Sequence, residues 1–336
     1  MREAVSLFSG SLSSSVSTEI AVNHCDLDRV IILTFRSPFF SYYEEIKNIA
    51  NHLWPDTQFR SKSIKRRTEN IASSGGTSLA GVDSFCLRCK LALLKTGGEF
   101  LDRMGADFLV SGETAGLKGG ERVEDLVEIE RLAGVEGLVF RPLSSNFSNS
   151  LPKRRGCVPA DENLEPNKEE SVRSLASKFG LKPETGFFEA GNRCKLTSPR
   201  YRRRLKDLVE EKHFNVNDLR LLDFEEYFKI TPNAKMVLAN SAEEKRELHN
   251  YFLPRDLRFY LPNRRGPMGL VRSNWDSEPR NVLDEVVNLA AKITVAKSEV
   301  DGRVRVPVNY RFEDDNETYS LEVLPLESRK LTELSL

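Results

Sequence analysis

The first 23 residues constrain the fold more than any other part of this 336-residue chain. Residues 3–8 (EAVSLF) predict a buried strand, and residues 16–23 predict a helix. Residues 9–15 (SGSLSSS), which join them, include five serines. A loop of this kind directs backbone N–H groups and the positive end of the helix dipole to one point, and serine hydroxyls add donors. The segment therefore predicts either an anion site or an ordinary serine-rich helix cap.

Apolar runs alternate with helical patterns after this turn. Further buried strands are predicted at residues 30–35, 58–64, 107–110 and 137–140, and helices at 42–53, 87–104 and 169–179. This alternation predicts an α/β fold with a doubly wound, mostly parallel sheet. Ligands of such sheets bind outside the carboxyl ends of the strands, where the serine-rich loop lies.

The pattern changes from about residue 223 onward. Short strands are predicted at residues 227–238 and 257–261, a helix at 282–295, and a half-buried antiparallel strand at 303–312, where apolar and polar residues alternate. We therefore expect a first domain at residues 1–215 that ends in a basic helix, 199–212. A smaller α+β domain is expected at residues 223–336.

Composition narrows the class of protein only in part. Fifty lysines and arginines balance fifty aspartates and glutamates, so only local patches can indicate a nucleic-acid partner. We recognise no secretory signal at the N-terminus and no apolar run long enough to span a membrane. Five cysteines, an odd number, do not indicate a disulfide framework, so a reducing cytoplasm is the expected compartment.

The serine-rich loop resembles the pyrophosphate loop of the PP-loop ATPases, whose pattern is Ser-Gly-Gly-x-Asp-Ser. Ser11 stands in place of the second glycine and Ser13 in place of the aspartate. Residues 108–114 (FLVSGET) resemble a strand end of the tRNA-thiolating members, the 4-thiouridine and 2-thiouridine synthases. Residues 141–143 (RPL) resemble another segment of the same enzymes, in the same order along the chain.

This resemblance implies ATP as a cofactor, with Mg²⁺. The implied nucleotide-binding residues are Ser9, Gly10, Ser11, Ser13, Ser14 and Ser15 around the phosphates, Phe35 and Arg36 near the base, and Gly112 and Glu113 in the pocket. A side chain at Ser11 is expected to crowd the phosphate or to prevent a positive φ. Because Ser13 replaces the aspartate, ATP affinity is expected to depend less on magnesium than in the relatives.

Three cysteines form a second candidate site. Cys86 and Cys89 form a C-x-x-C pair near a predicted helix start, and Cys194 precedes the basic helix. Three thiolates can hold an iron–sulfur cluster and leave one iron open. Part of the thiolating PP-loop family has this arrangement, which implies both a metal-binding and a catalytic role for the three cysteines. Three other interpretations stay open: a persulfide relay, a zinc site completed by Cys157, and cysteines without chemistry.

Basic residues gather in the predicted helix 199–212. Its candidate RNA contacts are Arg200, Arg202, Arg203 and Arg204, with Lys206 beside them. Runs of the sequence KRR also occur at residues 65–67 and 153–155. Clustered cations are what a phosphate backbone requires, although a solvated helix face is the ordinary alternative.

The C-terminal domain resembles the NFACT-R type of RNA-binding domain. The similar segments are residues 266–272 (GPMGLVR), 289–292 (LAAK) and 304–308 (VRVPV). Versions of that domain occur fused to PP-loop enzymes of RNA thiolation. The resemblance implies RNA contacts from Arg303 and Arg305, with Arg264, Arg265 and Arg311 as further candidates. The alternative is a small domain that only packs against the first.

Together these features predict ATP-dependent sulfur insertion into a tRNA base. The expected partners are tRNA and a sulfide or persulfide donor, and a homodimer stays open. One competing interpretation is a catalytically impaired PP-loop pseudoenzyme that binds RNA or removes sulfur. Another is an ATP pyrophosphatase that acts on a small substrate.

Overall fold

The structure is a computed structural model that forms two compact units. It describes residues 2–40, 42–68, 71, 84–113, 123–144, 169–182, 188, 194–210, 214–277, 279–300 and 304–336. The units are Met1–Pro199 and Arg200–Leu336, and each is described by itself. Outside the described residues lie Cys157, Arg303, the basic run 153–155 and most of the 144–166 segment.

The first unit contains a five-stranded parallel sheet, which confirms the predicted α/β class. Its strands are β1 (Glu3–Leu7), β2 (Arg29–Arg36), β3 (Gln58–Ser63), β4 (Phe108–Ser111) and β5 (Val139–Phe140). They lie in the order β3-β2-β1-β4-β5, and every pair is parallel. The chain builds outward from β1 in one direction and then from β4 in the other. The switch point of this doubly wound sheet therefore lies between β1 and β4.

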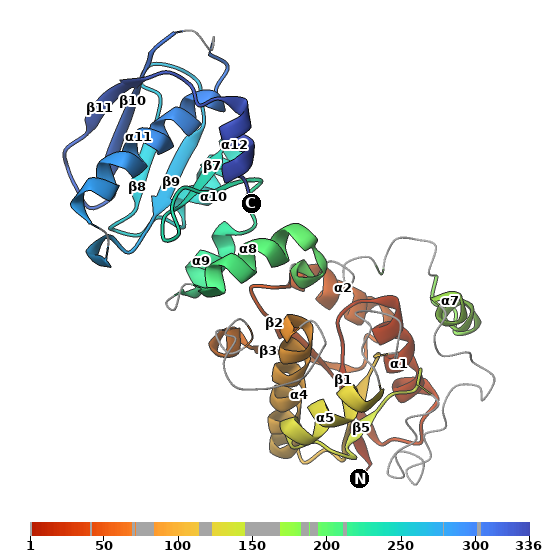
Figure 1. Ribbon diagram of the computed structural model, residues 1–336. Coiled ribbons are helices and arrows are strands. Elements are labelled where there is room, and N and C mark those ends of the chain that lie inside the picture. Colours follow the sequence, from red (N-terminus) through yellow and green to blue (C-terminus); the bar gives the residue numbers. More distant parts are fainter. Residues whose placement is uncertain are drawn as a thin grey trace. The chain divides into compact units, whose positions relative to one another are not determined.

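Helices cover both faces of this sheet (Figure 1). They are α1 (Leu12–Asn23), α2 (Tyr43–Leu53), α4 (Ser84–Met104), α5 (Val123–Ala133) and α7 (Glu169–Lys178). Side chains of α1, α2 and α7 share one core cluster with Val110 of β4. The neighbouring Leu109 faces α4, where a Cβ on Gly97 would lie 3.3 Å from its side chain. Because successive strand residues point to opposite faces, α4 lies across the sheet from α1.

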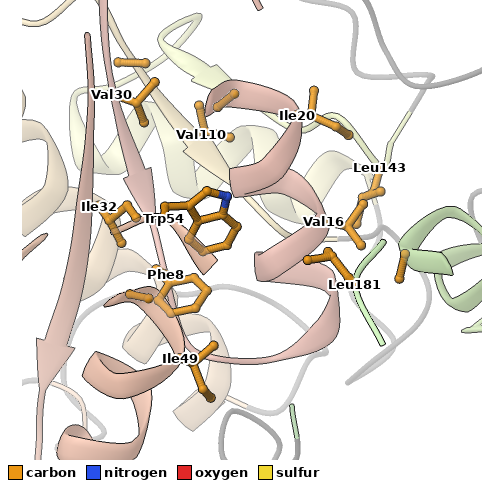
Figure 2. Close-up of a cluster of buried hydrophobic side chains, with 14 of the residues drawn as sticks. Phe8, Val16, Ile20, Val30, Ile32, Ile49, Trp54, Val110, Leu143 and Leu181 are labelled. Atoms are coloured by element: carbon orange, nitrogen blue, oxygen red, sulfur yellow. The ribbon is translucent and has the colours of Figure 1, made fainter. Parts of the chain in front are cut away.

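Aromatic packing holds α1 against the sheet (Figure 2). The rings of Phe8 and Trp54 meet edge to face, with centroids 5.6 Å apart. The buried Trp54 Nε1 donates to Glu19 Oε2 of α1 at 2.7 Å, so the indole leaves no unpaired donor. Val16 and Ile20, four residues apart on one helix face, are buried in the same cluster. This core determines where the N-terminus of α1 lies.

The second unit contains a six-stranded antiparallel sheet. Its strands are β6 (Glu226–Lys229), β7 (Lys235–Ala239), β8 (Leu257–Tyr260), β9 (Met268–Arg272), β10 (Val306–Phe312) and β11 (Tyr319–Val323), in the order β11-β10-β8-β9-β7-β6. Helix α11 (Arg280–Ala296) lies across one face (Figure 1). The other helices are α8 (Pro199–Glu210), α9 (Val216–Leu221), α10 (Ala242–His249) and α12 (Ser328–Leu334). The expected smaller α+β domain is confirmed. No helix among the described residues is long and apolar enough to cross a membrane.

One predicted strand of this unit is wrong in detail. Residues 227–238 form the hairpin β6–β7 instead of a single strand. The Ala234 N–H donates to the Thr231 hydroxyl at 2.9 Å, and Pro232 between them has no N–H to extend the ladder. A local hydrogen bond and a proline therefore reverse the chain where the apolar pattern alone predicted continuity.

The basic helix α8 belongs with the second unit, whereas we expected it to end a first domain at residue 215. Its Arg204 side chain is 1% exposed. The guanidinium donates to four backbone carbonyl oxygens at 2.5–2.9 Å, those of Leu222, Phe224, Glu225 and Leu336. Burial, followed by the nearby Arg200, lowers the pKa of Arg204 to about 10. Arg204 therefore stabilises the fold, and its predicted contact with RNA is wrong.

Replacing this buried arginine tests its structural role. The Arg204→Lys variant should lose roughly 3 kcal/mol of unfolding free energy, because an ammonium cannot reach all four carbonyls and leaves buried acceptors unpaired. Urea unfolding measures the loss. The matched control is Arg203→Lys, exposed on the same helix, which should stay within about 0.5 kcal/mol. Equal effects of the two substitutions would contradict this role.

Candidate nucleotide and thiol site

The serine-rich loop meets the end of β4 at the switch point of the parallel sheet. The loop follows β1, and Gly112 follows β4. A Cβ on Gly112 would lie only 2.5 Å from Ser14 Cα and 2.6 Å from Ser14 N. Only a glycine lets the two backbones approach this closely. The structure therefore brings together two segments that the sequence placed at the nucleotide.

The backbone of the loop accommodates Ser11 without strain. Gly10 has a φ of +75°, whereas Ser11 has a φ of −78° and caps α1. The expectation that a side chain at Ser11 opposes a positive φ is therefore wrong, because the left-handed position belongs to Gly10. The Ser11 hydroxyl accepts from the Ser14 N–H at 3.3 Å. With Ser11 as its N-cap, the first turn of α1 faces the loop.

Three serine hydroxyls gather at this helix N-terminus. The Ser9 and Ser11 oxygens are 3.0 Å apart, and each lies 3.2–3.3 Å from the Ser14 oxygen. The first turn of α1 contains no acidic residue. The buried Ser14 hydroxyl donates to the Ser11 carbonyl oxygen at 2.9 Å, so the cluster offers the Ser9 and Ser11 hydroxyls, backbone N–H groups and the helix dipole to one anion.

Ser15 does not belong to this group, although we predicted it at the phosphates. It is fully buried, and both its N–H and its hydroxyl donate to the Ser11 carbonyl oxygen at 2.9 Å. Its side chain stabilises the first turn of α1 and is not available to a ligand. The predicted contact between the Ser15 side chain and the phosphates is therefore wrong.

Phe35 and Arg36, predicted near the base, end β2. Phe35 is 9% exposed, on the same sheet face as the α4-facing Leu33. Arg36 is exposed, and its guanidinium lies 5.5 Å from the centre of the Tyr43 ring. Both residues lie at the carboxyl edge of the sheet, as the serine loop does. Their contact with a base stays a prediction.

Glu113, beside Gly112, belongs to a buried network of four charges. Its Oε1 lies 3.3 Å from Lys90 Nζ, and its Oε2 accepts from Arg141 Nε and Nη2 at 3.1 and 3.0 Å. Arg141, fully buried, also forms an ion pair with Glu130. Burial alone would raise the pKa of Glu113, but Lys90 and Arg141 lower it to about 2.

The network shows functional-site residues that the sequence did not identify. Arg141 belongs to the RPL segment, and its position now has a physical reason: it neutralises two buried carboxylates. Lys90 directly follows the C-x-x-C pair, so the network connects the end of β4 to the cysteine helix. Sequence spacing contained no signal for this pairing, because its partners lie 23 residues apart, on α4 and just after β4.

The cysteines come together at the same edge of the sheet. Cys86 and Cys89 lie one turn apart near the start of α4. Cys194 pairs with Phe40 in a β-bridge just beyond β2, and the Lys195 N–H donates to the Phe39 carbonyl oxygen at 3.1 Å. Burial, and then the nearness of Cys194 and Cys86, raise the pKa of Cys89 well above its usual value. Cys89 is therefore close enough to each of the other two thiols for them to affect its pKa.

The three cysteines are chemically suited to bind a metal, but their present arrangement is not that of a metal site. Three cysteines are ligands that iron–sulfur clusters and zinc use. Within the described ranges, no group of three or more His, Cys, Asp or Glu side chains is arranged to hold a metal ion. Burial also raises the pKa of Cys194. The thiols would have to approach one another and lose their protons to bind a metal.

The predicted RNA-binding arginines fall into different environments. Arg200 and Arg203 are exposed on α8, and Arg202 is half-buried there. Arg305 is exposed before β10, where its Nη1 donates to the Glu322 carbonyl oxygen at 3.3 Å. Arg264 and Arg265 are exposed between β8 and β9.

Comparison with known proteins identifies the second unit. Residues 226–334, from β6 to the end of α12, match the family described as the NFACT protein RNA binding domain. This confirms the NFACT-R resemblance for that part of the chain. The PP-loop assignment of the first unit stays a prediction. No curated protein sequence matches the chain.

Several solved structures are similar at TM-scores of 0.35 or less. A 4-thiouridine synthetase–RNA complex with bound ATP has 18% identity and a TM-score of 0.35, covering 55% of this chain and 53% of that one. The C-terminal part of a fibronectin/fibrinogen-binding protein from Streptococcus suis has 14% identity and a TM-score of 0.30, with coverages of 52% and 82%. A predicted tRNA methyltransferase subunit from Methanocaldococcus jannaschii has 14% identity and a TM-score of 0.29, with coverages of 55% and 91%.

The buried charge network predicts a particular pH dependence of stability. Because the pKa of Glu113 is about 2 against a usual 4.5, its charge stabilises the fold above pH 4.5, and this contribution is lost as the pH falls toward 2. Glu113→Gln should therefore cost about 2 kcal/mol at pH 7 and progressively less between pH 4.5 and 2.

Urea unfolding at several pH values measures this difference. The matched control is Glu136→Gln, an exposed carboxylate near the same sheet, which should change the unfolding free energy by less than about 0.5 kcal/mol at any pH. A Glu113→Gln effect that does not diminish in acid would contradict the ion-pair account.

Proposed function

We propose that the chain is an ATP-dependent RNA-modifying enzyme that inserts sulfur into a tRNA base. The observation that carries this proposal is the close contact of Gly112 with the backbone of Ser14 at the switch point. Around this contact lie an anion-binding helix N-terminus and a buried ion network that leads to three thiols. The RNA-binding family match of residues 226–334 supports RNA as the substrate class.

ATP would activate the base in the first step. The carbonyl oxygen of the base attacks the α-phosphorus, an O–P bond forms, and pyrophosphate leaves with the electrons of the broken P–O bond. The serine hydroxyls and the first N–H groups of α1 would stabilise the negative charge on the departing pyrophosphate. The base then carries an adenylate, whose carbon is electrophilic.

Sulfur would replace AMP in the second step. Sulfide, or the terminal sulfur of a persulfide, attacks the activated carbon, and AMP leaves with the former carbonyl oxygen. An iron–sulfur cluster on the three thiolates would supply an open iron for the incoming sulfide. Without a cluster, one of Cys86, Cys89 and Cys194 would carry the persulfide, whose attack joins the base to that cysteine through a disulfide. A second cysteine would break this S–S bond, releasing the thiolated base and forming a cysteine disulfide, which an external dithiol would reduce before the next cycle.

RNA would be held through phosphate contacts of the second unit. Arg200, Arg203, Arg264, Arg265 and Arg305 are its exposed candidates. Arg204 is excluded from this set because its donors are bonded to backbone carbonyls. In this proposal the first unit carries out the reaction and the second unit binds the RNA.

Nucleoside mass spectrometry of small RNA from a deletion strain tests the proposed reaction. One thiolated nucleoside should disappear, and the intact gene should restore it. The Cys89→Ala gene should not restore it, because that thiol lies among the three. The Cys25→Ala gene should restore it, because Cys25 packs with the core below α1. An unchanged set of thiolated nucleosides in the deletion strain would overturn sulfur insertion.

ATP binding should depend little on magnesium in this protein. The first turn of α1 lacks an acid, and both Glu113 oxygens already contact cations. Calorimetry with and without magnesium should give ATP dissociation constants within about threefold of each other, less than about 0.7 kcal/mol. The Ser13→Asp variant should show a larger magnesium effect, since it restores a carboxylate ligand. An absence of ATP binding to the natural loop would instead favour the RNA-binding pseudoenzyme.

A further inference from the structure

The edge strand of the first unit carries an unusual concentration of positive charge. Residues 58–68 (QFRSKSIKRRT) contain five cations and no acid. They form β3 and the short 3₁₀ helix η1 (Lys65–Arg67). Among the described strands β3 pairs with β2 alone, so none of them covers its outer edge. Arg60 and Lys65 are exposed, and Lys62 is half-buried.

Most of these cations lack a nearby carboxylate. Arg67 pairs with Glu99 at 2.5 Å. Within the described part of the chain, no ion pair involves Arg36, Arg60, Lys62 or Lys65. Lys62 instead lies 5.7 Å from the centre of the Phe100 ring, as Arg36 lies over Tyr43. An unneutralised row of cations is the electrostatic form that binds a phosphate backbone.

The row lies beside the candidate site. The Ile64 N–H at the end of β3 donates to the Arg36 carbonyl oxygen at 3.0 Å, so η1 begins at the carboxyl edge of the sheet. Phe39 and Phe40, which hold the Cys194 segment, follow Arg36 after two residues. β3 lies two strands from β1, a lateral distance of about 10 Å. An RNA strand bound along the row would therefore approach the carboxyl edge of the sheet, where the serine loop and the Cys194 segment also lie.

Protection of an open sheet edge accounts for only part of this pattern. Lysine and arginine on an edge strand prevent pairing with other chains, which would explain Arg60 and Lys62. The positive charge continues past the strand at Lys65, Arg66 and Arg67 of η1. Those positions have no edge to protect, so a bound anion explains the row better.

Arg36 lies over Tyr43 of α2, on the opposite face of the sheet from Lys62, which lies over Phe100 of α4. We propose that Arg60, Lys62 and Lys65 form a phosphate-binding ridge for RNA, here called the β3 ridge. It receives the strand that carries the target base and leads it to the carboxyl edge of the sheet. This inference rests on the proposed RNA-modifying function and adds a substrate-binding surface on the first unit, separate from the RNA-binding match in the second.

Salt-dependent binding of bulk tRNA to the full chain tests the ridge. The test variant is Arg60→Gln/Lys62→Gln/Lys65→Gln, in which Arg36 stays because it adjoins the predicted nucleotide pocket. Each lost phosphate contact should reduce the slope of log K against log salt by about 0.7–0.9, so the slope should fall by about 2–3. Affinity at about 0.1 M salt should fall at least about tenfold.

A matched variant removes the same number of charges elsewhere on the unit. Lys47→Gln/Lys95→Gln/Arg131→Gln changes cations on α2, α4 and α5 and should leave the slope unchanged. Urea midpoints and gel filtration of both variants check that the fold and the monomer–oligomer state are preserved. Acetylation by a water-soluble ester gives a positional readout: bound tRNA should protect Lys62 and Lys65 but not Lys47 and Lys95.

The possible outcomes separate the ridge from the function on which it rests. In one outcome the natural protein binds tRNA, the ridge variant keeps the same slope of log K against log salt, and Lys62 and Lys65 stay reactive toward the acetylating ester. The ridge proposal is then wrong, and the proposed function stands. If the ridge variant keeps its RNA affinity but self-associates, the cations protect the edge instead. If the natural protein binds no tRNA at all, both the ridge and the proposed function fall.

Discussion

The contact between Gly112 and the backbone of Ser14 is the constraint on which the candidate site depends. A Cβ at Gly112 would lie 2.5 Å from Ser14 Cα, so the end of β4 reaches the start of α1 only because that residue is glycine. The contact occurs between β1 and β4, where the sheet order reverses and parallel sheets open a crevice for ligands. The aromatic core around Phe8 and Trp54 holds α1 in the position that makes it possible.

The charge network extends this contact to the thiols. Lys90 and Arg141 neutralise Glu113 and Glu130, so four ionised groups share a buried region without net charge. Lys90 lies next to Cys89, and Cys89 in turn is close enough to Cys194 for their charges to interact. A displacement of Glu113 at the end of β4 would therefore act on α4, the helix of Cys86 and Cys89, through the ion pair with Lys90. This coupling gives the proposed nucleotide pocket and the proposed sulfur site a shared structural basis.

Sequence patterns predicted the regular parts well and the roles of single side chains less well. The buried runs of the parallel sheet were correct because each strand carries its own pattern of residues, whereas α1 and α4 begin three to four residues earlier than predicted and α5 was missed. The assignments of Ser15 and Arg204 to ligands were wrong, because composition does not show which way a side chain points. The hairpin at residues 230–234 was missed because one hydrogen bond and Pro232 reverse the chain within an apolar run.

The sequence by itself determined the α/β order of the first unit, the serine-rich turn after β1, and the similarity of residues 226–334 to a family of RNA-binding domains, because these depend on local patterns of residue type. Only the tertiary structure decided which cations are neutralised. Arg141 and Arg204 lie in buried networks, whereas Arg60 and Lys65 stay exposed without an ion pair among the described residues. The physical reason is that charge pairing and burial depend on residues far apart in sequence, which only the packing of the sheet and its helices brings together.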